Sequence, residues 1–153
     1  MLKTLCIGLV MVMAFVCLDG CAEGPSPATG GREPGVDFSK IHTMYVVKDD
    51  TTGDTTPVEQ ELTQRKFQVK SGPQEAAPKD IDCLVKSQQR WMWDLTMYLL
   101  ELKVDFLDPK TGALFASGRI YRPSLIRRSP EFMAHEVMEK ALGETVPAGS
   151  GGK

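Results

Sequence analysis

Two tryptophans in one short stretch are the side chains of this 153-residue chain best suited to binding. Trp91-Met92-Trp93-Asp94 is followed by Leu95 and Met97, so large apolar groups occupy alternate positions. Tryptophan is enriched at the energetic centres of protein interfaces, and its amphipathic ring also suits stacking on a sugar. We therefore predict that Trp91, Trp93, Asp94, Leu95 and Met97 bind a partner, either another protein or a glycan.

The same stretch has a structural alternative, because large aromatic side chains often dominate a protein core. Over residues 100–106 the apolar side chains fall on even positions, but over residues 91–99 they fall on odd positions. A β-bulge or turn near Asp94 would reverse the register and bring all of these groups into one core. A regular strand would instead expose an apolar patch of several hundred Å², the size that marks a contact surface. The sequence leaves both open.

Four arginines near one another in sequence are the second candidate. Arg119, Arg122, Arg127 and Arg128 are predicted to contact an anion, such as a lipid phosphate or an acidic partner. The alternative is an ordinary solvated face, since exposed charges pair weakly. The whole chain has 18 basic and 20 acidic residues and a net charge of −2, which argues against a nucleic-acid binder.

Catalytic chemistry has little support in the sequence. His42 and His135 lack the spacing of metal ligands, and no Gly-x-Ser-x-Gly, His-Glu-x-x-His or Cys-x-x-Cys motif occurs. Cys83 lies in a strand-like run without flanking cations, so we expect a buried, inert thiol. We therefore predict a protein that is not an enzyme, with no catalytic residue, metal or cofactor.

The first 20 residues predict export from the cytoplasm. Lys3 is followed by an almost unbroken apolar run over residues 5–16. A membrane-spanning helix takes about 20 residues, so this run is too short to span a bilayer and is typical of a signal peptide. Cys6 and Cys17 would leave with it, and with Cys21 modified, only Cys83 would remain as a thiol.

The end of this segment, Leu18-Asp19-Gly20-Cys21, resembles the lipobox of bacterial lipoproteins. The resemblance implies that Cys21 is diacylated and becomes the first residue of a membrane-anchored protein. Ala22 in the following position favours the outer membrane. The alternative is ordinary cleavage after Ala22, which would leave a soluble periplasmic protein.

The remaining chain predicts one small domain between two segments without structure. Residues 21–36 are rich in glycine and proline and are expected to form a flexible tether, and 144–153 a disordered tail. Periodicity and turn residues predict strands at 41–48, 67–69, 81–89, 95–107 and 113–122, and proline-started helices at 57–66 and 130–142. The order β-α-β-β-β-β-α over 37–143 indicates an α+β two-layer sandwich, with a mostly antiparallel sheet and both helices on one face.

This order, with Asp82, Leu84 and Val85 in one strand and a hairpin closed by Asp108, Thr111 and Gly112, resembles small periplasm-facing lipoprotein domains. They include lipoproteins of unknown function, activators of peptidoglycan synthases and the periplasmic domain of the curli secretion lipoprotein. The resemblance implies a protein-binding or assembly role. Our hypothesis is an outer-membrane lipoprotein on the periplasmic face, acting as an accessory factor that binds another envelope protein. A peptidoglycan-binding module using Trp91 and Trp93 is the alternative.

Overall fold

The computed structural model describes residues 28–49 and 52–143. The predicted signal peptide, the lipidation site Cys21 and the predicted tail lie outside the described residues. The elements in chain order are β1 (Thr29–Arg32), the 3-10 turn η1 (Phe38–Lys40), β2 (Thr43–Val47), α2 (Thr56–Gln64), β3 (Gln68–Gly72), η2 (Gln74–Ala76), β4 (Cys83–Trp93), β5 (Met97–Leu107), β6 (Leu114–Tyr121), η3 (Ser124–Ile126) and α3 (Pro130–Leu142).

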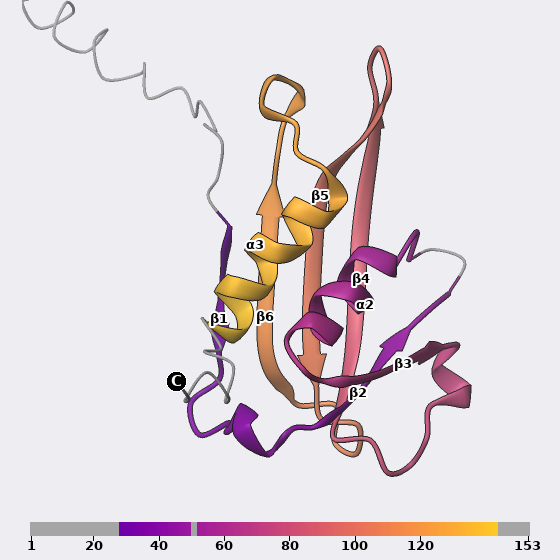
Figure 1. Ribbon diagram of the computed structural model, residues 1–153, viewed down its shortest axis with the longest axis vertical. Helices are drawn as coiled ribbons and strands as arrows, with labels where there is room; N and C mark the ends of the chain where they lie inside the picture. The colour runs from indigo at the N-terminus through magenta and orange to yellow at the C-terminus, as the bar shows by residue number, and fades with distance from the viewer. Residues whose placement is uncertain (1–27, 50–51, 144–153) are drawn as a thin grey trace, which may run out of the picture.

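The strands form one six-stranded sheet in the order β1-β6-β5-β4-β2-β3. β4, β5, β6 and β1 pair antiparallel, while β2 runs parallel to both β3 and β4. α2 and α3 lie together on one face of the sheet (Figure 1). The predicted α+β two-layer architecture with a mostly antiparallel sheet is therefore confirmed.

β1 corrects the prediction that the chain has no element before residue 37. Thr29–Arg32, in the range predicted as a tether, pairs with β6 at the edge of the sheet. At Gly30 the backbones come so close that an added Cβ atom would lie 2.3 Å from the carbonyl oxygen of Ser117. Glycine in this segment thus allows a close backbone approach, whereas the sequence suggested only flexibility.

The two helices begin at proline-containing turns, as predicted. Ser129 caps α3, because its hydroxyl accepts a hydrogen bond from the backbone N–H of Phe132 at 3.3 Å. For the other helix, Thr56 before Pro57 is the cap that the sequence suggests. The N-cap of α2 is instead Thr55, whose hydroxyl donates to the Glu59 carboxylate and not to the backbone.

The core lies between the helices and the sheet. The buried side chains of α3 recur at helical spacing along one face: Met133, Ala134, Val137, Met138, Ala141 and Leu142. They pack against β4, β5 and β6, where Val85, Leu102, Val104 and Phe106 are also buried. Gly118 of β6 lies under α3 and allows the helix to approach the sheet closely.

Candidate functional site: the apolar end of the β4–β5 hairpin

The β4–β5 hairpin projects beyond the helix layer at one end of the molecule (Figure 1). Trp93 pairs with Met97 across its last rung, and the backbone N–H of Asp94 donates to the carbonyl of Thr96 to close the turn. The predicted turn at Asp94 is therefore present. It joins the two longest strands of the sheet and carries the residues predicted to bind a partner.

A register shift in the hairpin explains why the apolar positions change from even to odd. Arg90 pairs with Glu101 and Trp91 pairs with Leu99, so Leu100 has no partner on β4. This β-bulge turns Leu99 toward the helices, where it is buried in the core. Directly opposite residues share a face of the sheet, so Trp91, Trp93 and Met97 continue this helix-facing side.

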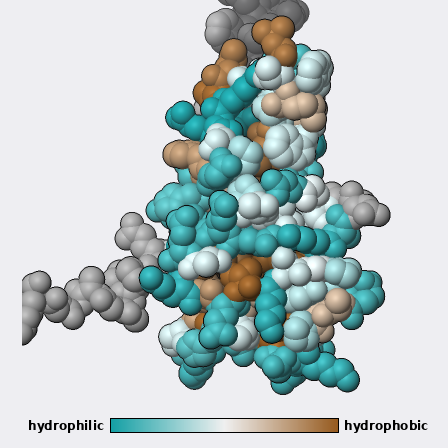
Figure 2. All heavy atoms as spheres, turned by 45° about the vertical axis from the view of Figure 1, so that its right-hand side comes forward, coloured by the Kyte–Doolittle hydropathy of each residue, from teal (hydrophilic) through white to brown (hydrophobic). Residues whose placement is uncertain are grey.

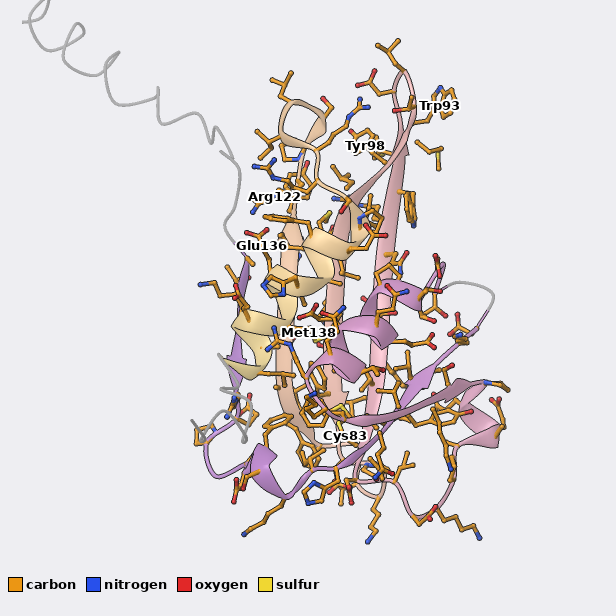
Figure 3. The ribbon with its side chains drawn as sticks, in the orientation of Figure 1. Cys83, Trp93, Tyr98, Arg122, Glu136 and Met138 are labelled. Carbon is orange, nitrogen blue, oxygen red and sulfur yellow. The ribbon has the colours of Figure 1, made fainter. Side chains whose placement is uncertain are left out.

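These side chains nevertheless stay outside the core, because the helices do not extend over the end of the hairpin. The exposed fraction is 37% for Trp91, 69% for Trp93, 55% for Met97 and 87% for Leu95. Hydrophobic groups gather at this end in Figure 2, and Figure 3 shows Trp93 projecting from the hairpin near its turn. The bulge of the first alternative is therefore present, but it does not bring all of these groups into the core. The second alternative placed an exposed patch on the face away from the helices, whereas these exposed side chains lie on the helix-facing side.

Trp91 is held in place at the base of this patch. Its indole N–H donates to the side-chain oxygen of Gln89 at 3.0 Å, and the Gln89 amide donates to the backbone carbonyl of Asp54 at 2.6 Å. A tryptophan positioned in this way loses little conformational freedom on binding, which favours it as an anchor.

A second loop lies against the hairpin turn. Arg127, which follows η3, donates to the Asp94 carboxylate at 2.6 Å and to the Thr96 hydroxyl at 2.9 Å. Its guanidinium group also lies 4.3 Å from the centre of the Tyr98 ring. Next to it, Leu125 is 97% exposed, and the sequence analysis did not select it. Leu125 and Ile126 form an apolar pair between Ser124 and Arg127, which is too short to give a periodic pattern, so only the tertiary structure could place Leu125 here.

The four arginines do not form the predicted basic cluster. Arg119 pairs with Glu101 on the sheet face away from the helices, and Arg122 pairs with Glu136 of α3 (Figure 3). Arg127 is paired with Asp94, while Arg128 lies over the ring of Phe132. The four arginines are close in sequence, but the alternation of side chains along β6 and the turn after this strand place them on different surfaces.

Other candidate groups have structural partners. Burial raises the pKa of Cys83 to about 12, so this thiol stays protonated at neutral pH, in agreement with the predicted inert thiol. His135 bridges the helices, with Nδ1 2.9 Å from Glu61 and Nε2 3.3 Å from Glu139. Within residues 28–49 and 52–143, no three His, Cys, Asp or Glu side chains are grouped as metal ligands, and no helix is long and apolar enough to cross a membrane.

Comparison with known proteins yields only a similarity of fold. No protein-family model matches the chain, and no curated protein does. The structure is similar to the PelC dodecamer from Paraburkholderia phytofirmans, with a TM-score of 0.52 and 12% sequence identity, covering 77% of this chain and 97% of that one. A variant of that dodecamer gives a TM-score of 0.51 at 14% identity, covering 76% and 96%. At these identities the likeness concerns the fold alone.

Proposed function

We propose that this chain is a lipoprotein of the periplasmic face of the outer membrane, anchored through lipid on Cys21, which acts as a non-catalytic accessory or assembly factor. It binds another envelope protein through the hairpin face, defined here as Trp91, Trp93 and Met97. The exposure of these three side chains on one side of a projecting hairpin is the observation that carries the proposal. Large apolar groups clustered on an exposed face are typical of contact surfaces.

The composition of the hairpin face favours a protein over a glycan. Met97 pairs directly with Trp93, and the exposed Leu95 lies at the adjoining turn. Flexible, polarizable methionine adapts to apolar protein surfaces. A sugar site would require convergent polar groups beside the rings, but the carboxylate of Asp94, the residue after Trp93, is paired with Arg127. Peptidoglycan binding by Trp91 and Trp93 therefore stays the alternative.

Photo-crosslinking in living cells tests the partner contact. A photoreactive amino acid replaces Trp93 in the full-length protein, and a matched variant carries it at Lys110, an exposed position in the turn between β5 and β6. We expect a discrete heavier band from the Trp93 position only, identified by mass spectrometry. The dodecamer in the PelC structure means that a second copy of this chain must be distinguished from a different protein. No band, or only a self-crosslink, would contradict the proposal.

Two further measurements separate the parts of the proposal. Cys21→Ala should leave the fold intact and move the protein from the membrane to the soluble fraction, and retention of that variant on membranes in high salt would contradict the lipid anchor. Titration of the purified domain with peptidoglycan fragments tests the alternative. A saturable change in tryptophan fluorescence that Trp91→Ala and Trp93→Ala both abolish would favour the glycan over the protein partner.

A further inference from the structure

β1 begins at its end nearer to the hairpin turn. β1 runs antiparallel to β6, with Thr29 opposite Arg119 and Arg32 opposite Ala116. β6 runs from the β5–β6 turn toward the hairpin end, so Thr29 is the residue of β1 closest to that end. Cys21 precedes Thr29 by eight residues, so a lipid on Cys21 would be joined to the domain at this end of the sheet.

The segment from Cys21 to Thr29 is long enough to reach the level of the hairpin turn. Thr29 follows Cys21 by eight residues, which can span at most about 28 Å. Thr29 is level with Lys103 through Arg119, and β5 advances at most about 20 Å from Lys103 back to Met97, with the bulge at Leu100 included. Leu95 lies in the turn just beyond Met97. With the strands upright on the membrane, Cys21 can therefore reach the height of Leu95.

Two loops at this end of the molecule each carry an exposed leucine. Leu95 in the hairpin turn is 87% exposed and Leu125 in the loop after β6 is 97% exposed, and we call them the apical leucines. Both belong to ordered loops, because Arg127 bonds the second loop to the first through Asp94 and Thr96. Two projecting leucines on separate loops suit a flat apolar medium better than a single protein pocket.

One arginine near the apical leucines also suits a lipid surface. Arg122 is paired with Glu136 and Arg127 with Asp94, so these two side chains add no net positive charge. Arg128 follows in the same loop, and its guanidinium group lies over the ring of Phe132. A cation beside exposed apolar groups is favourable at anionic phospholipid headgroups.

We propose that the apical leucines insert into the surface of the bilayer that holds the lipid of Cys21, so that the domain stands on the membrane at the tether and at these two loops. This rests on the lipid anchor of the proposed function and goes beyond it. The hairpin face lies next to the turn that carries Leu95. It would then meet its protein partner close to the bilayer, within the length of the segment from Cys21 to Thr29.

Fluorescence of the lipidated, full-length mature protein in vesicles of phosphatidylethanolamine and phosphatidylglycerol tests this insertion. Leu95→Cys and Leu125→Cys each receive an environment-sensitive dye, and Lys110→Cys is the matched control. The buried Cys83 thiol, with its pKa of about 12, does not compete for the dye. We expect the dyes at both apical positions to emit at shorter wavelength and to lose most of their emission to spin-labelled lipid, and the dye at Lys110 to do neither.

The outcomes separate the two proposals. Protein that floats with the vesicles, but whose dye at either apical position matches the Lys110 control, overturns the insertion and leaves the anchor intact. A blue shift that spin-labelled lipid does not quench also overturns it, because it places the leucine against protein. Lipidated protein that fails to float with the vesicles overturns both the anchor and the insertion that depends on it. The absence of a crosslink from the Trp93 position would contradict only the proposed protein partner.

Discussion

Replacing Gly118 by alanine tests how closely α3 packs on the sheet. A Cβ atom at this position would lie 2.7 Å from the carbonyl oxygen of Val137, 2.8 Å from its Cγ1 and 3.1 Å from the Cβ of Ala141. Ordinary contacts begin near 3.4 Å, so the helix backbone would have to retreat by about 0.7 Å from a close-packed core. The backbone of α3 cannot avoid the clash by rotating a side chain.

Overpacking of this kind lowers the free energy of unfolding by about 1–3 kcal/mol, and we expect a loss of about 2 kcal/mol for Gly118→Ala. Gly31 provides the matched control, since it also lies in a strand but an added Cβ atom there would have no heavy atom within 4 Å. Gly31→Ala should be neutral or stabilise by up to about 1 kcal/mol through the unfolded chain. Urea denaturation followed by far-ultraviolet circular dichroism is the suitable assay, because Trp91 and Trp93 are too exposed to report on the core.

Equal unfolding midpoints for the two variants would refute this packing of α3. The double variant Gly118→Ala with Val137→Ala need not regain stability. The atom closest to the added Cβ is the backbone oxygen of Val137, which remains when the Val137 side chain is shortened. A gain in stability for Gly118→Ala would require that the helix stand farther from β6 than the structure places it.

Three further predictions concern individual groups. Arg127→Ala should lower stability by no more than about 1 kcal/mol, because the ion pair with Asp94 is partly exposed, but should accelerate amide hydrogen exchange in the hairpin turn; unchanged exchange would contradict the bridge. In a mature chain with Cys21→Ala, Cys83 should not react with a thiol reagent until urea unfolds the domain. Hydrogen bonds from the backbone N–H groups of His42 and Thr43 lower the pKa of Asp82. The contribution of Asp82 to the free energy of unfolding is therefore complete above the unfolded pKa of about 3.9, and it is lost as pH falls through the lower pKa of the folded state. Asp82→Asn should flatten the fall in stability below about pH 4.

Local patterns were sufficient to predict most elements of this fold. Pro130 after Ser129 predicted the start of α3, and the change of apolar periodicity near Leu99 and Leu100 indicated a bulge as one of two alternatives. Both features depend on a few neighbouring residues, so they are visible in one sequence. β1 was missed because its pairing with β6 depends on Gly30 approaching Ser117, a contact between residues 87 positions apart.

The candidate site was predictable in its residues but not in its arrangement. Trp91 and Trp93 were selected from residue type and spacing, yet their exposure depends on where the helix layer ends. Leu125 joins them only because the loop carrying it is bonded to the hairpin turn through Arg127. Partners of this kind are set by tertiary structure, since nothing in the local sequence relates residue 125 to residue 95.

The lengths of the two layers explain why the hairpin end stays exposed. α3 has 13 residues and therefore spans about 20 Å, whereas the 11 residues of β4 span about 37 Å. Helices of this length cannot cover the last rungs of the hairpin, and polar side chains would serve folding equally well there. Leu95, at 87% exposure, gains almost nothing from burial in this domain. Burial of its apolar side chain, and of that of Trp93, would require a surface beyond the described residues, which is why the lipid and the protein partner that we propose are the contacts to test first.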